Sequence, residues 1–324
     1  PAFAKQPARL RQELSGEYVK QFYRALKHSN MVNYVRFEEE NFFIDDKGVL
    51  QRFPNESEPP SVDLSVIVPS YNEELRLPVM IDEAISYLED LLSRENTKYE
   101  IIIVDDGSKD KTAEIGYKYT KTYGADKVRV LKLKRNRGKG GAIRLGMQSA
   151  RGEYLLFADA DGASKFSDLS KLRTALKDIT HGTNEGEGWQ CQGIAVGSRS
   201  HLEKESTATR SVFRTMLMYG FHFLVWLFCV RSIRDTQCGF KLFTRRSAHV
   251  LFSILHVERW AFDVELLKIA EALQIPMKEV AVTWHEVDGS KITPIVTWIE
   301  MGIDIFIIWF RYRMGIWTLL SKNE

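Results

Sequence analysis

Short apolar runs alternate with amphipathic stretches from about residue 64 onward. Runs of this length, in which polar positions do not alternate with apolar ones, are typical of strands buried on both faces. The stretches between them, such as residues 78–92, have the spacing of helices. Strands that alternate with helices predict an α/β fold, a Rossmann-like and mostly parallel sheet flanked by helices. The predicted strands are residues 64–69, 100–104, 127–133, 153–158 and 192–196.

Four strand ends carry polar loops that contain glycine. The carboxyl ends of parallel strands meet at one edge of a sheet, which is where ligands of open α/β sheets bind. One such loop is equally well a turn, but four together predict a single nucleotide cleft.

Asp159 and Asp161 follow the fourth strand, separated only by Ala160. Side chains alternate along a strand, so both carboxylates leave it on the same side. Gly162 then allows a close turn of the backbone. Two hard carboxylates suit Mg²⁺ or Mn²⁺ held jointly with substrate phosphates. The alternative is a polar turn that only caps the strand.

Acidic and glycine-rich loops supply the remaining candidate nucleotide contacts. Glu73, Asp105 and Asp106 offer acceptors for the N–H of a base and for ribose hydroxyls. Lys139 lies in a glycine run at a helix start, where backbone N–H groups and an ammonium suit a diphosphate. A solvated turn is the alternative for this run. The chain lacks the dinucleotide-binding and P-loop patterns, so the set fits a sugar nucleotide.

Composition narrows the partners and the compartment. The 324 residues carry a formal net charge of +2, so the charge balance gives no indication of nucleic-acid binding. Cys191, Cys229 and Cys238 are odd in number and have no metal-binding spacing, which predicts reduced thiols on the cytosolic side of a membrane.

The predicted organisation has three parts. Residues 1–60 form an N-terminal extension and a proline-containing linker, and residues 61–290 form the α/β domain, which includes an apolar segment at 210–231. Residues 291–324 form a C-terminal part. Within the extension, residues 10–26 have the spacing of a basic amphipathic helix, either packed on the domain or lying on a membrane surface.

Neither apolar segment is a clean membrane span. A helix over residues 215–230 would reach about 24 Å, short of the roughly 30 Å hydrocarbon core. In the helix expected from residue 294 to about 320, charged Glu300, Asp304 and Arg311 lie opposite the apolar face. We expect both segments to lie in the plane of the membrane interface, with Arg311 and Arg313 at headgroup level. The apolar face comprises Trp298, Gly302, Ile305, Trp309 and Ile316.

Four motifs resemble those of family 2 glycosyltransferases of the GT-A fold: VPSYNEE at 68–74, VDDGS at 104–108, NRGKGGA at 136–142 and DADGA at 159–163. Three later segments are similar to those of the dolichyl-phosphate β-glucosyltransferase branch of that family. They are GSRSHLEKE at 197–205, DTQCGFKLF at 235–243 and HVERWAFDVE at 256–265. The resemblance extends from about residue 38 to residue 313.

This resemblance implies inverting transfer of glucose from UDP-glucose to dolichyl phosphate, as a sugar donor for N-glycosylation. It implies an enzyme at the endoplasmic reticulum membrane with its active site facing the cytosol. The metal would be held by Asp159 and Asp161, with Asp161 also counted among the catalytic residues. The implied nucleotide contacts are Pro69, Tyr71, Glu73, Asp105, Asp106, Lys139, Asp159 and Ala160.

A phosphate acceptor of this kind is largely a dianion at neutral pH, so it needs no general base. It needs positive charge that holds it in line with the anomeric carbon. We assign Arg199, Arg210 and Arg214 to this role because guanidinium groups match phosphate oxygens bidentately. The alternative for them, above all for Arg210, is surface charge or an anchor that flanks a membrane segment.

The later segments add candidates for the sugar and the diphosphate. Gln237 and Lys241 lie in the segment that faces the donor in the family, and a role for Gln237 as a turn residue is the alternative. Trp260 is expected to stack on the glucose ring and Asp263 to bind sugar hydroxyls, unless Asp263 is only a favourable charge at a helix N-terminus.

Two departures and two alternatives remain. A glutamine often stands at the position of Ala163 in related mannosyl enzymes, which puts a third metal ligand from this loop in doubt. The branch usually begins with a hydrophobic membrane anchor, which this chain does not show. Mannosyl or other glycosyl transfer to a polyprenyl phosphate stays open; an alcohol acceptor would require a base such as Asp235 or Asp263. The other alternative is a non-catalytic sugar-nucleotide-binding module at the membrane.

Overall fold

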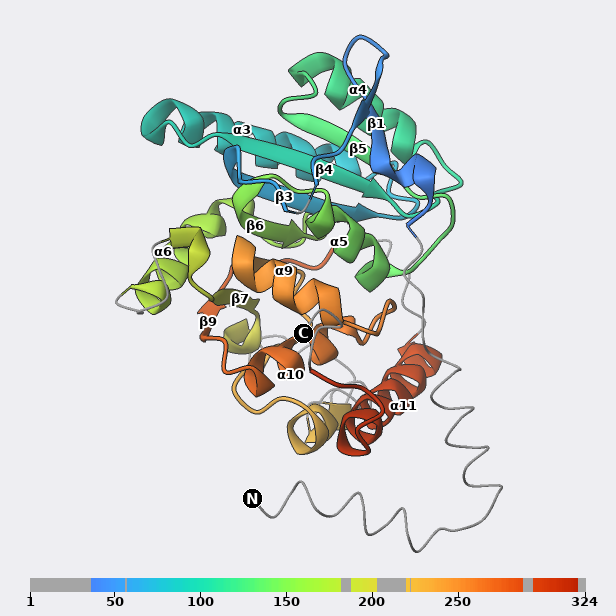
Figure 1. Cartoon of the computed structure of the whole chain (residues 1–324), viewed down its shortest axis with the longest axis vertical. Coiled ribbons are helices and arrows are strands. Elements are labelled where there is room, and N and C mark those ends of the chain that lie inside the picture. The colour runs from blue at the N-terminus through green and yellow to red at the C-terminus, as the bar shows by residue number, and fades with distance from the viewer. Residues whose placement is uncertain are drawn as a thin grey trace, which may run out of the picture.

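A seven-stranded sheet runs through the chain in the order β5-β4-β3-β6-β8-β7-β9 (Figure 1). The computed structural model describes residues 36–55, 57–181, 188–202, 220–221, 223–287 and 294–319, with the backbone alone for 294–300. The strands are β3 (Val62–Ser70), β4 (Tyr99–Asp105), β5 (Val128–Lys132), β6 (Gly152–Ala158), β7 (Ile194–Ser198), β8 (Phe240–Thr244) and β9 (Met277–Ala281).

The five predicted strands correspond to β3, β4, β5, β6 and β7, and β3 continues through Pro69 to Ser70. Pro69 lies beyond Ile67, the last β3 residue that pairs with β6. The other two strands of this sheet were not predicted. β8 lies between β6 and β7 and is antiparallel to both, whereas β9 pairs in parallel with β7. The sheet is therefore mostly parallel, as expected, with one antiparallel insertion.

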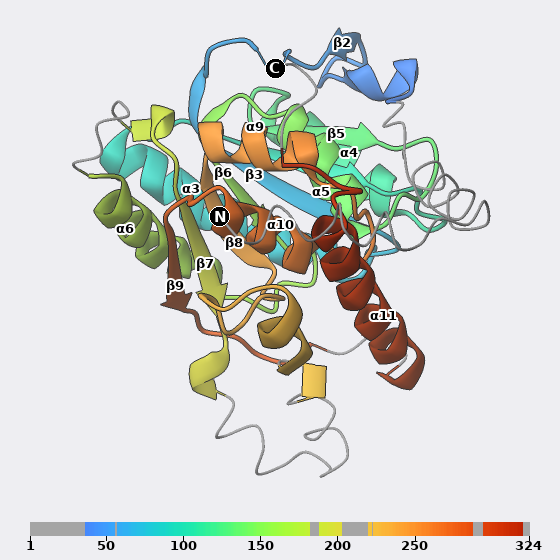
Figure 2. The ribbon, with the colours of Figure 1, turned by 60° about the horizontal axis from the view of Figure 1, so that its bottom comes forward.

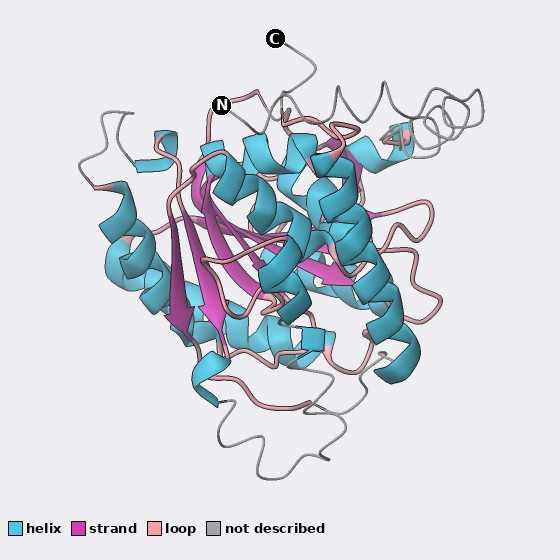
Figure 3. Cartoon of the chain, turned by 90° about the horizontal axis from the view of Figure 1, so that it is seen from below, coloured by secondary structure: helices cyan, strands magenta, loops and turns pink. Residues whose placement is uncertain are grey.

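Helices cover both faces of this sheet (Figure 3). On one face lie α5 (Lys139–Gln148), α9 (Arg245–Ile254) and α10 (Phe262–Ala272), with α11 (Pro294–Arg313) packed beyond them. On the other lie α3 (Leu77–Glu95), α4 (Thr112–Tyr123) and α6 (Leu169–Thr180) (Figure 2). Short 3₁₀ turns are η1 (Glu38–Asn41), η2 (Phe166–Asp168), η3 (Gly188–Gln190) and η4 (Ser200–Leu202).

Alternation along the strands explains the two layers. In β3, Ile67 packs into the cluster under α5 and α9, and its neighbours Val66 and Val68 pack into the cluster under α3 and α6. All three are fully buried. A strand with both faces covered shows no polar alternation, which is the pattern that identified it.

Residues 36–55 pack directly on the sheet domain. Their hairpin of β1 (Phe42–Ile44) and β2 (Leu50–Arg52) lies beside β5 (Figure 1), and Phe53 is part of the core. The buried carboxylate of Glu40 pairs with the guanidinium of Arg137 at 2.8 Å. The domain boundary near residue 60 stays a prediction, but the second half of the predicted extension is joined to the domain by buried contacts.

The C-terminal helix α11 differs in part from the expected pattern. Ile305 is fully buried in the core, and Trp309 packs on Phe228 with ring centroids 5.2 Å apart. Arg311 was expected at headgroup level, and this was wrong: it is buried, with its guanidinium 4.9 Å from the ring centre of Trp317. Arg313 is exposed, as expected. The side chains of Trp298 and Glu300 lie outside the described residues.

The outward face of α11 and the helical residues 223–228 are apolar. Ile303 and Phe306 are exposed on α11, and Phe223, Trp226 and Leu227 are exposed on the other segment. Within the described residues, no helix combines the length and the apolar character that a membrane crossing requires. The predicted interface orientation of the two segments stays a prediction.

The three cysteines are free thiols, and all three are buried. This agrees with the expectation of reduced cysteines.

Candidate active site

The first three strand-end loops contact one another, as their position at one sheet edge predicts. Ser70 pairs with Asp105 across β3 and β4, and the Asp106 N–H donates to the Ser70 carbonyl at 2.8 Å. The Asn72 N–H donates to the hydroxyl of Ser108 at 2.9 Å. These contacts place Tyr71 and Glu73 beside the loop that follows β4.

Asp106 holds the glycine-rich loop at the start of α5. One of its carboxylate oxygens accepts the Arg137 N–H at 2.7 Å and the other accepts the Gly138 N–H at 2.9 Å. Gly138 has a φ of 83°, which favours glycine. Burial raises the pKa of Asp106 to about 7, although the two N–H donors lower it. Asp106 is buried and supports this loop.

Asp105 is buried beside it and has an unused acceptor. One oxygen accepts the Ser108 N–H at 3.1 Å. The other oxygen is shielded from solvent and has no hydrogen-bond partner among the described residues. Such an atom is costly to leave unpaired, so it marks a place for a donor from a ligand.

Asp159, which follows β6, forms an ion pair with Lys139 at the start of α5. The ammonium of Lys139 lies 2.7 Å from one carboxylate oxygen of Asp159 and 2.9 Å from the other. Behind this pair, Lys241 is fully buried and donates to the carboxylate of Asp263 at 2.6 Å and to the Cys238 carbonyl at 2.7 Å. The field of Asp263 also acts on Lys139. Two positive and two negative side chains therefore form one partly buried cluster.

Asp161 lies beside this cluster in an environment that disfavours its charge. Burial raises the pKa of its carboxyl group, and the charge of Asp159 raises it further. The Ala163 N–H, donated at 3.0 Å, and the charges of Lys139 and Arg76 act in the opposite direction.

Arg199 and Asp235 form a bidentate ion pair at the end of β7. Two guanidinium nitrogens of Arg199 lie 2.8 and 2.9 Å from the two oxygens of Asp235. The guanidinium also lies 5.5 Å from the ring centre of Trp284. Burial works against ionisation of Asp235, but the charge and hydrogen bonds of Arg199 lower its pKa to about 2. Asp235 is thus ionised at every ordinary working pH.

The remaining predicted residues differ in their burial and contacts. Pro69 and Tyr71 are half-buried at the cleft edge, and Ala160 is buried between the two acids. Glu73 is held by Arg76 through two contacts of 2.6 and 2.7 Å. The amide of Gln237 lies 3.9 Å from the sulfur of Met301, and Trp260 is exposed. Arg210 and Arg214 lie outside the described residues.

Three residues near the acids were not found by sequence reasoning. They are Arg76, Gly239 and Trp284. Arg76 sits just before α3 and Trp284 just after β9, so neither belongs to a motif that was recognised. Gly239 is inside a recognised motif, but its role comes from the antiparallel pairing of β8 with β6.

Comparison with known proteins identifies the family to which this chain belongs. The model of the family described as Glycosyl transferase family 2 matches residues 65–252. The dolichyl-phosphate beta-glucosyltransferase of Drosophila melanogaster is 57% identical over 294 residues, covering 90% of this chain and 88% of the relative. The protein of that name from Homo sapiens is 58% identical over 290 residues, covering 89% of this chain and 88% of the relative. The chain belongs to glycosyltransferase family 2, among the dolichyl-phosphate β-glucosyltransferases.

This family 2 member is a glycosyltransferase, so the alternative of a non-catalytic binding module loses its support. A solved structure of glucosyl-3-phosphoglycerate synthase from Mycobacterium tuberculosis, in complex with Mg²⁺ and UDP, matches with a TM-score of 0.50 and 16% identity. The match covers 79% of this chain and 80% of that chain. At this identity the likeness concerns the fold, and it confirms the predicted GT-A-like architecture.

The acid pair of this glycosyltransferase fits a divalent cation. The ammonium of Lys139 already stands against Asp159, and burial beside a like charge leaves Asp161 poorly compensated. No group of three or more acids, histidines or cysteines with metal-site geometry occurs in the described part of the chain. A Mg²⁺ or Mn²⁺ ion held by Asp159 and Asp161 would therefore take its other ligands from phosphates and water, as Mg²⁺ sites commonly do.

Replacing Gly239 by alanine is expected to weaken cation binding about tenfold, because disturbing the orientation of a metal ligand typically costs at least that much. The Asp159 N–H donates to the Gly239 carbonyl at 3.0 Å, and a Cβ at Gly239 would overlap the Asp159 carboxylate. Mn²⁺ titration followed by electron paramagnetic resonance measures the effect. Gly302→Ala is the control, because among the described residues a Cβ there meets only Leu224, at 3.9 Å. Equal affinity for both variants would contradict the placement of Asp159.

As the pH is lowered, cation affinity is expected to begin falling at a higher pH than it would with an aspartate of ordinary pKa. Because the pKa of Asp161 is raised by burial and by Asp159, protons compete with the cation at a higher pH than they would at an ordinary aspartate. Below that raised pKa, the apparent dissociation constant should rise about tenfold for each pH unit. Mn²⁺ titrations between neutral and mildly acidic pH test this. Asp161→Asn should bind the cation more weakly, and its dissociation constant should depend less on pH. An unchanged pH dependence in this variant would show that another group causes it.

Proposed function

We propose that this enzyme transfers glucose from UDP-glucose to the phosphate of dolichyl phosphate, with inversion, giving dolichyl β-D-glucosyl phosphate and UDP. The observation that carries the proposal is the 57–58% identity, over about 90% of the chain, to proteins named for this activity. We propose that it works at the cytosolic face of the endoplasmic reticulum membrane and supplies glucose for lipid-linked oligosaccharides of N-glycosylation.

The donor nucleotide is proposed to bind along the loops that follow β3, β4 and β5. The unpartnered oxygen of Asp105 would accept a donor from the base or ribose. Pro69 and Tyr71 border this place, and Arg76 keeps the carboxylate of Glu73 oriented. Lys139, at the first position of α5, would turn from Asp159 toward the diphosphate.

Asp159 and Asp161 are the proposed ligands of Mg²⁺ or Mn²⁺, and Mg²⁺ and UDP are bound together in the fold relative from Mycobacterium tuberculosis. A divalent ion at this place would offset the negative charge of the UDP leaving group. The residues of this chain contribute two carboxylates on one turn and a nearby lysine.

The state of Asp235 supports a phosphate acceptor. An alcohol acceptor needs a general base, but a carboxylate with a pKa of about 2 that is held by Arg199 is a poor one. Asp263, the other candidate base, is buried against Lys241. A phosphate dianion needs no base and gains from the exposed part of Arg199. Arg210 and Arg214 stay proposed partners of Arg199 in this role.

The sugar contacts are proposed at the N-terminus of α10. Trp260 is exposed just before the helix and offers a ring face for the glucose. Lys241 is fully buried, so we assign it to orienting Asp263 rather than to direct contact with the donor. Gln237 lies toward α11, with its amide 3.9 Å from the sulfur of Met301.

Transfer from radiolabelled UDP-glucose, and in parallel from GDP-mannose, to dolichyl phosphate in neutral detergent micelles tests the proposal. The expected result is a chloroform-soluble product from UDP-glucose alone that is lost in EDTA and regained with Mg²⁺ or Mn²⁺. A product from GDP-mannose alone would overturn the donor assignment. Binding of UDP without transfer to any polyprenyl phosphate would overturn the acceptor assignment.

A further inference from the structure

A second cavity lies at the opposite end of α10 from Asp263. Its volume is about 350 Å³, and it is lined by residues 226–229 and 231, the second half of α10 and the end of α11. Lys268 is five residues beyond Asp263, which corresponds to about 7.5 Å along the helix. Of the predicted donor, metal and acceptor residues that the structure describes, none lines this cavity.

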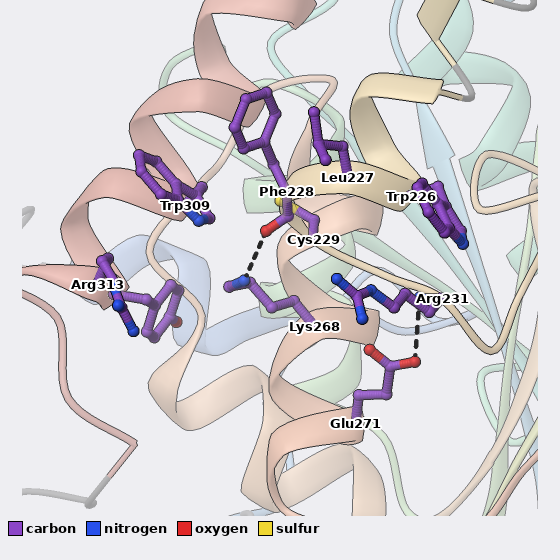
Figure 4. Close-up of a pocket in the computed structure, with 10 residues that line it drawn as sticks. Trp226, Leu227, Phe228, Cys229, Arg231, Lys268, Glu271, Trp309 and Arg313 are labelled. Atoms are coloured by element: carbon purple, nitrogen blue, oxygen red, sulfur yellow. Dashed lines mark hydrogen bonds between the residues drawn. The ribbon is translucent and has the colours of Figure 1, made fainter. Parts of the chain in front are cut away.

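Three cationic side chains line the cavity: Arg231, Lys268 and Arg313. Figure 4 shows Lys268 and the guanidinium of Arg231 extending into the space between Trp309 and Trp226. The ammonium of Lys268 donates to the Phe228 carbonyl at 3.0 Å. An ammonium has three N–H donors, so this contact still leaves donors for a ligand.

One acidic side chain, Glu271, also lines the cavity, and it stabilises a backbone turn. An oxygen of Glu271 accepts the backbone N–H groups of Arg231 at 3.1 Å and Ser232 at 2.8 Å, which fixes the turn that carries Arg231. The side chains that line the cavity, three cations and one carboxylate, carry a formal charge of +2. This charge favours binding of an anion.

The cavity opens at an apolar surface. Trp226 lines it and is also 52% exposed, next to exposed Phe223 and Leu227. On α11, Phe306 is exposed and packs edge-on against Phe228 with ring centroids 6.1 Å apart. Exposed aromatic side chains beside arginine and lysine are typical of protein surfaces that sit at the headgroup level of a bilayer.

We propose that this cavity binds the phosphate-bearing headgroup of an anionic phospholipid, at a site separate from that of the acceptor lipid. The exposed aromatic side chains would enter the interface, and the cations would receive the phosphate. Phosphate oxygens match arginine and lysine donors, and the cavity size suits a headgroup. The proposal rests on the proposed function only in placing the enzyme on a bilayer.

Flotation of the full chain with vesicles tests this site without any transfer reaction. The vesicles contain phosphatidylcholine alone or with a minority of phosphatidylinositol. We expect tighter binding to the anionic vesicles, and a loss of about fivefold for each cation removed, which corresponds to about 1 kcal/mol per charge near the surface. The double variant Arg231→Gln/Lys268→Gln should therefore bind anionic vesicles about 25-fold more weakly.

Two further variants distinguish binding at this cavity from a general effect of surface charge and from misfolding. Lys118→Gln/Lys121→Gln removes the same charge from exposed positions on α4, at the far end of the molecule from α11 (Figure 1), and should bind like the wild type. Arg231→Lys/Lys268→Arg keeps both charges and should restore most of the binding. Trp226→Ala should weaken binding to both kinds of vesicle.

Four results would overturn the proposal: no preference of the wild type for anionic vesicles, an equal loss in the α4 control, full binding by Arg231→Gln/Lys268→Gln, or equal loss in the charge-keeping variant. Displacement from the vesicles by inorganic phosphate at low concentration would assign the cavity to a soluble anion instead. Self-association through this face, seen by sedimentation without vesicles and lost in Trp226→Ala, would assign it to a second copy of the chain. Transfer in neutral detergent should stay unchanged in Arg231→Gln/Lys268→Gln, so the two proposals fail independently.

Discussion

Replacing Asp161 by asparagine is expected to lower kcat for glucose transfer about 10³-fold, a cost of about 4 kcal/mol in transition-state stabilisation. An amide keeps the size of the side chain but removes one of the two negative charges that would hold the divalent ion beside the diphosphate. The field at this position disfavours a free carboxylate, since burial and Asp159 both raise the pKa of Asp161. The same substitution should therefore leave the metal-free protein at least as stable as the wild type.

The measurement is kcat at saturating UDP-glucose and dolichyl phosphate, together with thermal unfolding in EDTA. Asp178→Asn is the matched control: Asp178 is an exposed aspartate of α6 that pairs with Lys278 at 2.9 Å, away from the cleft. We expect near-normal activity for this control. If folded Asp161→Asn kept wild-type activity, the acid pair would not be the metal site. Unfolding of this variant in EDTA at a lower temperature than the wild type would contradict the expected stability.

The strand ends were predictable because their information is local. Each buried strand is a short apolar run, and the polar residues that follow it must lie at the carboxyl edge of a parallel sheet. Asp105, Asp159 and Arg199 were placed correctly at the ends of β4, β6 and β7 by this reasoning alone. Their partners come from distant parts of the chain, and apolar spacing contains no information about them.

The pairing of Lys241 with Asp263 shows the limit of such reasoning. The segment around Lys241 was expected to face the donor because of the family resemblance, and no strand was predicted there. In the structure this segment begins β8, and Lys241 is buried because its ammonium reaches both Asp263 and the Cys238 carbonyl. A buried charge that is paired in this way carries no recognisable sequence pattern.

Arg311 was misplaced for a related reason. Helical spacing correctly put Ile305 and Trp309 on an apolar face, and it put Arg311 opposite them. The segment after α11 folds back, and Trp317 covers the guanidinium. Amphipathic spacing describes a single helix and contains no information about a later segment that covers its other face.

Replacing Arg199 by glutamine is expected to lower kcat/KM for dolichyl phosphate by about 10³-fold, with a much smaller effect on the affinity for UDP. Its guanidinium has five N–H donors, and Asp235 occupies two of its nitrogens in a bidentate contact. We propose that the remaining donors receive the phosphate dianion of the acceptor at the end of β7.

Comparison of Arg199→Lys with Asp235→Asn separates charge from orientation. Lysine keeps the charge but loses the fork, so it should recover only part of the activity. Asp235→Asn keeps the guanidinium but loosens its orientation, and we expect a loss of about tenfold to a hundredfold, mainly in kcat. The double variant Arg199→Gln/Asp235→Asn should be no worse than Arg199→Gln alone, because Asp235 acts through Arg199. Additive losses in that cycle, or an unchanged KM for dolichyl phosphate in Arg199→Gln, would show that the acceptor phosphate is held by other residues.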